Sequence, residues 1–320
     1  MSRVRVCFLG TPAFAVTCLQ GLLDDSHFEV VGVVTQPDRP AGRKMVLTPS
    51  PVKLLAQKYS LPILSPESVN KDPIREEVAR WGAEVAVVVA FGQIVSQKFL
   101  DLFPMGCVNV HGSLVPRWRG AAPIQRALEA GDQESGVALQ KMVKELDAGD
   151  VLGVRRLVLD LKINALELHD QLAKLSVDLL QVELMDYLRG NLVPTPQDAT
   201  KVTYAKKLDK SESLLHWSEQ AEKLHNKVRS FLLGPGTYTF WAGKKLKIHR
   251  TEWIPGSESG APGQIHSLDE TGIVVQTGAG RLRLIEVQPE SRQKMSAVDF
   301  AKGYSLGVGD RFTEDGTTHG

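Results

Sequence analysis

A side-chain amide and an imidazole lie two residues apart in this sequence, at Asn109 and His111 within the stretch NVHGSLVPRW. The apolar, β-branched residues around them predict a strand, in which residues i and i+2 project from the same face. An imidazole can donate or accept a proton near neutral pH, whereas an amide donates hydrogen bonds without titrating. The pair suits addition to a carbonyl group, because an oxyanion develops there and protons must move.

A carboxylate should accompany the imidazole, because a nearby acid sets its tautomer and favours its charged form. The stretch KELDAGDV offers Glu145, Asp147 and Asp150, and Asp147 lies in a turn directly after a strand-like run. An Asp close to a Gly is also an ordinary turn signal. A single Asn or His can likewise satisfy main-chain groups in a turn. The spacing alone therefore leaves catalysis and turn formation as equal alternatives.

The elements around these residues predict an α/β fold. Short apolar runs alternate with helix-like stretches through the first half of the chain, and the runs are VRVCFLG, EVVGVVT, AEVAVVVAF and GCVNVH. Such runs fit a Rossmann-like, mostly parallel sheet with helices on both faces, in which ligands bind beyond the carboxyl ends of the strands. His111 lies at such an end. The turn GTPAFA, which starts at Gly10, lacks the further glycines of a dinucleotide-binding loop.

The second half of the chain predicts a smaller β domain. Short strands separated by Ala-Gly and Thr-Gly turns are typical of a small OB-like β-barrel. Polar residues and two prolines before it predict a linker. We expect a catalytic domain at residues 1–189, a linker at 190–206, the OB-like domain at 207–312 and a tail at 313–320.

Composition narrows the class of protein. The chain has 320 residues, of which 42% are hydrophobic and 23% charged, with a net charge of +1 that argues against a uniformly basic surface. Three cysteines without CxxC spacing support neither a disulfide framework nor a zinc site. No apolar run has the length of a membrane helix. We therefore expect a cytoplasmic protein with no metal and no membrane association.

Several long motifs resemble the 10-formyltetrahydrofolate-dependent formyltransferase family. NVHGSLVPRWRGAAPIQRALEAGD is similar to the family signature, and the motifs TQPDRPAGR, PSPVK, VVVAFGQI, ELDAGDV and TYAKKL follow its order and spacing along the whole chain. Many motifs in order are far more specific than one short motif. The resemblance implies transfer of a formyl group from 10-formyltetrahydrofolate. Within the family it is strongest to the enzymes that formylate the methionine of initiator Met-tRNA, and we expect a bacterial, monomeric enzyme.

The resemblance also implies site residues. Asn109, His111 and Asp147 match the catalytic set of the family, so we expect the acceptor amine to attack the formyl carbon without a covalent enzyme intermediate. The stretch of Ser113, Leu114, Val115 and Pro116 should border the folate, and the stretch of Phe91, Gly92, Gln93 and Ile94 should line the pteridine slot. Val115 is a conservative departure from the family pattern. The stretch SFLLGPG at residues 230–236 departs from an Asn-Pro-Trp-Pro run, so no role is carried over to it.

Basic residues in two regions predict contacts with tRNA, although each region could also be an ordinary solvated surface. A long polar loop contains Arg39, Arg43 and Lys44, and the family uses a loop at this place to sense the tRNA end. Between residues 201 and 250, eleven Lys and Arg residues stand against four Asp and Glu residues, an excess of seven positive charges. The contacts expected there are Lys206, Lys207, Lys244, Lys245 and Lys247.

Three other functions stay open. A sugar-nucleotide N-formyltransferase shares the Asn, His and Asp residues and the folate donor, but its function does not require the basic loop that contains Arg39, Arg43 and Lys44. A protein that binds tRNA or folate without catalysis has no need of the three residues together. An oxidoreductase needs a nicotinamide site, and the first loop lacks the glycines for one.

Overall fold

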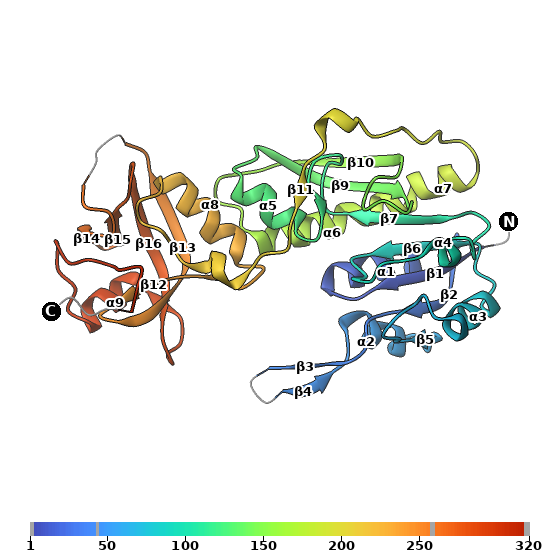
Figure 1. Cartoon of the computed structure of the whole chain (residues 1–320), viewed down its shortest axis with the longest axis horizontal. Helices are drawn as coiled ribbons and strands as arrows, with labels where there is room; N and C mark the ends of the chain where they lie inside the picture. Colours follow the sequence, from blue (N-terminus) through green and yellow to red (C-terminus); the bar gives the residue numbers. More distant parts are fainter. Residues whose placement is uncertain (1–2, 43–44, 257–259, 317–320) are drawn as a thin grey trace. The chain divides into compact units, whose positions relative to one another are not determined.

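The computed structural model describes residues 3–42, 45–256 and 260–316, and the chain divides into two compact units (Figure 1). The first unit comprises Met1–Gly120, Glu134–Val158 and His169–Ala205, and the second comprises Ala121–Gln133, Leu159–Leu168 and Lys206–Gly320. The domain boundaries expected from the sequence stay a prediction. No helix in the described ranges has the length and apolarity needed to cross a lipid bilayer.

A seven-stranded sheet forms the centre of the first unit, in the order β10-β9-β7-β6-β1-β2-β5. The strands are β1 (Val4–Gly10), β2 (Phe28–Val34), β5 (Ile63–Leu64), β6 (Val85–Val89), β7 (Cys107–His111), β9 (Glu134–Lys141) and β10 (Val151–Val158). The first five run parallel to one another, and β9 runs antiparallel to both β7 and β10. The prediction of a mostly parallel sheet is confirmed.

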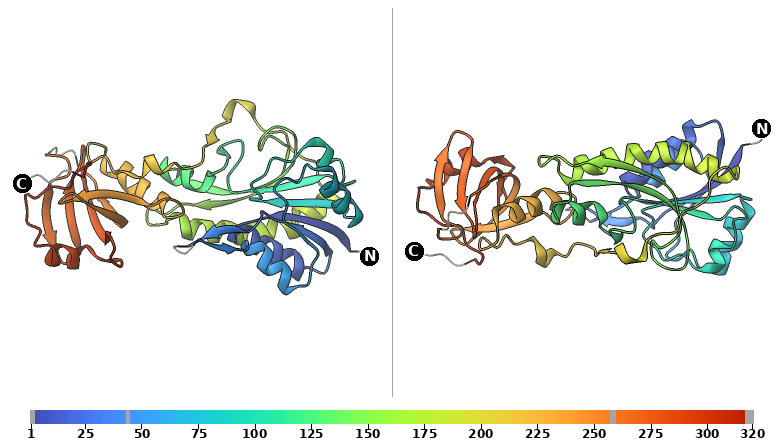
Figure 2. Two further views of the ribbon diagram at one scale, coloured as in Figure 1. Left: turned by 60° about the horizontal axis from the view of Figure 1, so that its bottom comes forward. Right: turned by 90° about the horizontal axis from the view of Figure 1, so that it is seen from above.

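Helices cover both faces of this sheet, as predicted. On one face, α3 (Asp72–Arg80) and α4 (Gln97–Leu100) share a buried cluster with the strands, in which Val78 and Phe99 join Leu9 and Val88. On the other face lie α1 (Ala13–Asp24) and α6 (Ala165–Gln181) (Figure 2). Because both faces of the central strands are covered, these strands consist almost entirely of apolar residues.

Shorter elements complete the first unit. They are the helices α2 (Pro51–Lys58) and α7 (Glu183–Leu188), the 3-10 helix η1 (Ala199–Lys201), the antiparallel hairpin of β3 (Arg39–Ala41) and β4 (Val46–Thr48), and the parallel pair of β8 (Arg119–Gly120) and β11 (Tyr204–Ala205). The pair of β8 and β11 joins the loop after β7 to the last segment of this unit.

The loops at the carboxyl ends of β1, β2 and β6 are bound to one another. The Thr11 hydroxyl donates a hydrogen bond to the Phe91 carbonyl oxygen at 3.0 Å, and Gln36 Nε2 donates to the same oxygen at 3.2 Å. In the sheet, β2 lies on one side of β1 and β6 lies on the other. The carboxyl end of β1 is therefore a topological switch point, where the loops after the strands on either side of it lead in opposite directions. Open α/β sheets bind ligands in the crevice at such a point.

Antiparallel strands form the second unit, in the order β12-β13-β16-β15-β14 with β17 paired to β16. The strands are β12 (Thr237–Trp241), β13 (Lys244–Ile254), β14 (Ile265–Asp269), β15 (Gly272–Gln276), β16 (Arg281–Pro289) and β17 (Met295–Ser296), and the helices are α5 (Pro123–Glu129), η2 (Lys210–Ser213), α8 (Ala221–Phe231) and α9 (Ala297–Gly303). Trp217, Ile248, Leu284 and Phe312 belong to its buried core. The antiparallel C-terminal domain is confirmed, and closure of its strands into a barrel stays a prediction.

Gly32 of β2 is a position where packing leaves no room for a side chain, because an added Cβ would collide with the Trp81 ring. We expect Gly32→Ala to lower the free energy of unfolding by about 1–3 kcal/mol, since an extra methyl group in a packed core displaces its neighbours. Urea unfolding followed by circular dichroism measures the change. Gly303→Ala is the control, because the added Cβ would meet no atom within 4 Å other than those of the adjacent residues and its own helix backbone. Equal stability of Gly32→Ala and the wild type would contradict this packing argument.

Candidate functional site

The strand β7 presents Asn109 and His111 on one face, as its period predicts. Val108 and Val110 alternate with them and are buried. His111 is 6% exposed and Asn109 is partly buried. In the pairing of β7 with β9, Asn109 lies directly opposite Gln140. The register of the sheet therefore places a buried amide beside the predicted pair.

The Asp147 carboxylate lies beside both predicted side chains. Its Oδ1 accepts a hydrogen bond from Asn109 Nδ2 at 3.3 Å, and its Oδ2 lies 3.7 Å from His111 Nδ1. Glu145, which the sequence offered as an alternative, is exposed. The structure thus brings Asn109, His111 and Asp147 together, while their catalytic roles stay a prediction.

A hydrogen bond at Nε2 indicates which ring nitrogen of His111 carries the proton. Nε2 lies 2.9 Å from the carbonyl oxygen of Trp118. A carbonyl oxygen only accepts, so Nε2 is protonated in the neutral ring. Nδ1 then faces the Asp147 carboxylate with a lone pair, or with a second proton when the ring is charged. Nδ1 is therefore the ring nitrogen that faces the carboxylate.

Residues that sequence reasoning missed hold the Asp147 carboxylate in place. The Gly120 amide donates to Oδ2 at 2.8 Å, and Gln140 Nε2 donates to Oδ1 at 3.4 Å. Asp147 has a left-handed φ of 49°, a conformation that costs roughly 1–3 kcal/mol in a residue other than glycine. Gly149 allows the turn to close, because a Cβ there would collide with the Lys141 carbonyl group. Surrounding contacts must therefore maintain this turn.

The loop after β7 contains the residues predicted to border the folate. Ser113 is buried, and its hydroxyl donates to the Arg117 carbonyl oxygen at 2.7 Å. Leu114, Val115 and Pro116 are partly buried. Ser113 shapes this loop from within, and the next three residues keep apolar surface that a ligand can contact.

The loop after β6 contains the residues predicted to line the pteridine slot. Phe91 is buried, and Gly92 has a φ of 83°. Both ends of the Gln93 amide bind main-chain groups of the segment before α3, at 2.8 and 2.9 Å. Ile94 is 88% exposed. The loop therefore offers the apolar Ile94 side chain to a ligand, while the Gln93 amide is already occupied.

Arg39, predicted to contact tRNA, begins the hairpin of β3 and β4. It pairs with Glu67 at 2.7 Å, and both side chains are more than half exposed. An exposed ion pair contributes at most about 1 kcal/mol to stability. A phosphate can therefore replace Glu67 as the partner of Arg39 with little loss of stability. Arg43 and Lys44, predicted for the same loop, lie outside the described residues.

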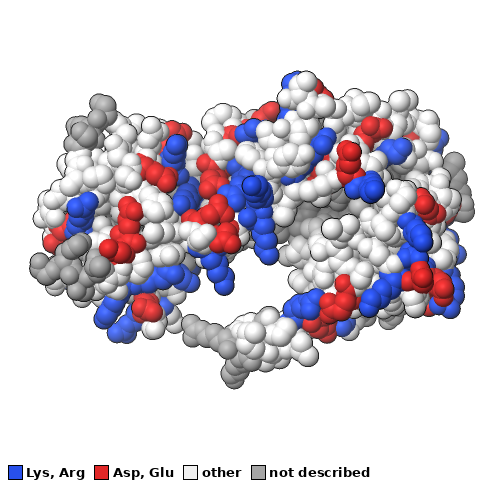
Figure 3. Space-filling model, in the orientation of Figure 1, with Lys and Arg blue, Asp and Glu red and all other residues white. Residues whose placement is uncertain are grey.

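The remaining predicted tRNA contacts are exposed in the second unit, and they are Lys206, Lys207, Lys244, Lys245 and Lys247. Lys245 Nζ lies 3.5 Å from the centre of the Tyr238 ring, which is a cation–π arrangement. Acidic side chains are interspersed with basic ones on the face seen in Figure 3. On that face, the basic side chains therefore do not form one uniform surface.

Arg126 of α5 holds the main chain that carries Lys206 and Lys207. Its guanidinium forms a two-pronged ion pair with Glu212, at 2.8 and 3.0 Å, and it also pairs with Glu129 at 2.6 Å. It donates to the carbonyl oxygens of Lys206 and Lys207 at 3.1 and 3.4 Å. The hydrogen bonds from Arg126 hold the pKa of the Glu212 carboxyl below its ordinary value. The two lysines thus extend from a fixed backbone.

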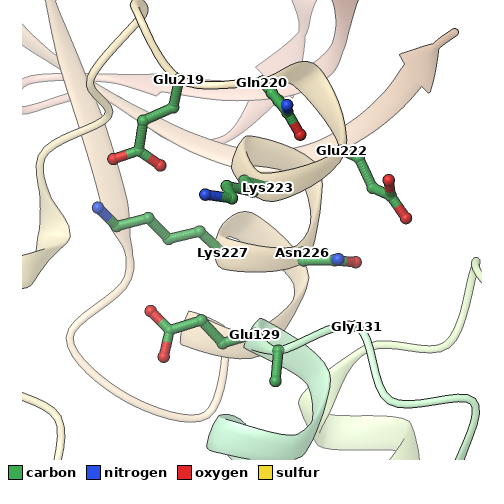
Figure 4. Close-up of a pocket in the computed structure, with 9 residues that line it drawn as sticks. Glu129, Gly131, Glu219, Gln220, Glu222, Lys223, Asn226 and Lys227 are labelled. Atoms are coloured by element: carbon green, nitrogen blue, oxygen red, sulfur yellow. The ribbon is translucent and has the colours of Figure 1, made fainter.

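A polar pocket of about 410 Å³ lies within the second unit, lined by Glu129, Ala130, Gly131, Glu219, Gln220, Glu222, Lys223, Asn226 and Lys227. Figure 4 shows Lys223 and Lys227 of α8 extending to the same side as Glu219. None of the predicted site residues lines this pocket. Within the described part of the chain, no three His, Cys, Asp or Glu side chains are placed to hold a metal ion.

Comparison with known proteins identifies the family. The model of the formyl transferase family matches residues 3–183, and the model of its C-terminal domain matches residues 207–305. The chain belongs to the formyl transferase family. A methionyl-tRNA formyltransferase from Bdellovibrio bacteriovorus is 64% identical over 315 residues, which cover 97% of this chain and 99% of the relative. One from Symbiobacterium thermophilum is 41% identical and covers 97% of this chain and 95% of the relative.

Solved structures of formyltransferases and related proteins share the fold. The sugar 3N-formyltransferase WlaRD, determined with dTDP and 5-N-formyl-tetrahydrofolate, matches with a TM-score of 0.65 and 16% identity, covering 92% of this chain and all of WlaRD. HypX from Aquifex aeolicus, in complex with tetrahydrofolic acid, matches with a TM-score of 0.62 and 16% identity, covering 96% of this chain and 48% of HypX. At these identities the likeness extends to the fold alone.

The pair of Arg126 and Glu212 predicts a pH-dependent contribution to stability. Since the pKa of Glu212 is lower in the folded chain than in the unfolded chain, its carboxylate stabilises the fold above the unfolded pKa, and this contribution is lost as the pH falls through the folded pKa. We expect Glu212→Gln to be less stable than the wild type at pH 7, with a difference that shrinks below about pH 4. Gln can retain the capping box at η2.

Urea unfolding followed by tryptophan fluorescence between pH 7 and pH 3 measures this difference. Glu270→Gln, at an exposed turn of the same unit, is the matched control and should follow the wild type at every pH. A difference between Glu212→Gln and the wild type that stays constant down to pH 3 would contradict the linkage.

Proposed function

We propose that the chain transfers the formyl group of 10-formyltetrahydrofolate to the α-amino group of methionine on initiator Met-tRNA, giving formylmethionyl-tRNA. The observation that carries the proposal is the convergence of Asn109, His111 and Asp147 at the carboxyl end of β7. This convergence occurs in a chain that is 64% identical, over nearly its full length, to a methionyl-tRNA formyltransferase.

Asn109 and His111 stabilise the charge that develops as the amine attacks the formyl carbon. The Asn109 amide has two N–H groups, of which one is bound to Asp147, so the second can donate to the oxyanion. The His111 ring carries positive charge when both its nitrogens are protonated, and it is fixed at Nε2 by the Trp118 carbonyl group. Preorganised donors of this kind typically contribute about 10² to 10³ in rate.

Asp147 completes the site by taking part in proton transfer. At 3.7 Å, its Oδ2 is too far from His111 Nδ1 for a direct hydrogen bond, so a water molecule or the attacking amine can bind between them. The pair receives the proton that the amine releases and passes it to N10 as the bond between N10 and the formyl carbon breaks, so that tetrahydrofolate leaves. The nucleophile is the substrate amine, so no side chain forms a covalent bond to the formyl group.

The two predicted folate loops have the chemistry that a flat heterocycle requires. Leu114, Val115 and Pro116 present apolar surface in the loop after β7, and Ile94 does so in the loop after β6. Main-chain groups around Gly92 can satisfy the polar ring edge. When bound, the folate supplies a formyl group that is already activated by its N10 leaving group.

The acceptor contacts and the cellular setting complete the proposal. Arg39 and the exposed lysines of the second unit contact tRNA phosphates. A monomer suffices, because one chain supplies all three polar side chains of the site. The cytoplasm of a bacterium is the setting that fits a tRNA acceptor.

Acceptor choice tests the proposed function directly. The protein is supplied with 10-formyltetrahydrofolate and either charged initiator Met-tRNA or a dTDP-linked amino sugar, and the formylated products are separated and quantified. We expect formylmethionyl-tRNA as the product. Preferential formylation of the amino sugar would favour a sugar-nucleotide N-formyltransferase, and absence of product with both acceptors would leave a binding protein.

Replacement of the polar side chains tests the mechanism. We expect His111→Ala to lower kcat/KM for Met-tRNA by about 10² to 10⁴, because both charge stabilisation and proton transfer are lost. Asn109→Ala should lower kcat/KM by about 10² to 10³. His27→Ala is the control, since that ring is half exposed and pairs with Asp25 away from the site. Near-normal turnover in His111→Ala would overturn the assignment.

A further inference from the structure

We propose that Gln197 is a positioning residue for formyl transfer, which holds the turn of Asp147 against His111. This inference rests on the proposed function of the site. Gln197 belongs to the segment of residues 190–206, which the sequence predicts to be a linker. Its side chain is partly buried, and its contacts are directed at the catalytic turn.

The Gln197 amide contacts four residues of the first unit. Its Nε2, which carries two hydrogens, lies within hydrogen-bond distance of three acceptors: the main-chain carbonyl oxygens of Asp147 and Gly149, each at 2.8 Å, and Gln140 Oε1 at 2.9 Å. Its Oε1 accepts from Arg119 Nε at 3.1 Å and from Arg119 Nη2 at 2.7 Å. Both ends of one amide are therefore used, and two of its contacts are to the turn that contains the carboxylate.

The chemistry of these partners permits one orientation of the amide. Carbonyl oxygens only accept hydrogen bonds, so the Nε2 group must face Asp147 and Gly149. A guanidinium only donates, so Oε1 must face Arg119. The orientation of Gln140 follows, because its Oε1 is occupied by Gln197 and its Nε2 is left to donate to Asp147 Oδ1 at 3.4 Å. A continuous chain of hydrogen bonds thus leads from Arg119 to the catalytic carboxylate.

The main chain on both sides of Gln197 is also fixed. Before it, the Thr195 amide and carbonyl groups bond to those of Val151 at 2.9 and 2.8 Å. After it, the Thr203 carbonyl oxygen accepts from the Arg119 amide at 2.9 Å, and the Thr203 hydroxyl accepts from the Trp118 amide at 2.9 Å. Gln197 therefore extends from a backbone that is anchored to β10 and to the loop after β7.

This support matters because the turn is strained and its position is critical. Asp147 has a left-handed backbone, which surrounding contacts must maintain. A shift of about 1 Å at a reacting centre can cost roughly 10²-fold in rate. Gln197 touches main-chain atoms of the turn and no reacting group, so it acts through Asp147.

Two substitutions separate the contacts of Gln197. Gln197→Met keeps the length of the side chain and removes all its hydrogen bonds. Gln197→Glu keeps an acceptor for Arg119 but cannot, when ionised, donate to the turn. We expect both to lower kcat for formyl transfer about 10- to 100-fold, with KM for both substrates changed less than about 3-fold. The control is Asp198→Ala, which alters an exposed cap of η1 and should leave kcat unchanged.

Full activity in Gln197→Met would overturn the proposal, and so would full activity in Gln197→Glu, because it would show that only the Arg119 contact matters. A double-mutant cycle adds a readout that general destabilisation would not reproduce. In the Asp147→Ala background, Gln197→Met should cause no further loss of kcat. Losses that multiply would show that Gln197 does not act through Asp147.

Hydrogen exchange at the Gly120 amide tests the positioning without any activity measurement. This amide donates to Asp147 Oδ2 at 2.8 Å, so its exchange should become faster in Gln197→Met and stay unchanged in Asp198→Ala. Unchanged exchange in Gln197→Met would overturn the proposal even if formyl transfer is established. Faster exchange in a chain that transfers no formyl group would support the positioning role and overturn the proposed function.

Discussion

The Asp147 carboxylate is the group on which the rest of the site depends. It accepts hydrogen bonds from Asn109, Gly120 and Gln140, and it faces the His111 ring. Its side chain is only 12% exposed, and a carboxylate with so little access to water needs hydrogen-bond donors from the protein instead. The same donors orient it beside the His111 ring.

The topology of the sheet supplies these donors. Parallel strands place the loops after β1, β2 and β6 at one edge, where Thr11 and Gln36 bind a common carbonyl oxygen. The antiparallel strand β9 then places Gln140 opposite Asn109. The following turn returns Asp147 to the same residues, since its carboxylate contacts both. A parallel strand and its antiparallel neighbour can therefore both contribute polar residues to the same site.

In the second unit, one paired arginine holds the backbone of two exposed lysines. Arg126 is occupied by two carboxylates and two carbonyl groups, and it fixes the backbone from which Lys206 and Lys207 extend. Their side chains stay exposed. Holding the backbone while leaving the lysine side chains in water lowers the ordering cost of meeting a phosphate. The proposed tRNA contacts of these two lysines thus combine a fixed backbone with exposed side chains.

The sequence by itself determined the α/β class, the mostly parallel sheet and the family, because apolar runs, strand period and contiguous motifs are local properties. It also placed Asn109 and His111 on one face. The tertiary structure alone decided which groups surround Asp147. Gly120 and Gln197 reach it across 27 and 50 residues of chain, and Gln140 reaches it through strand register. Hydrogen-bond partners so distant in sequence are set by strand pairing and loop return, neither of which leaves a periodic signal.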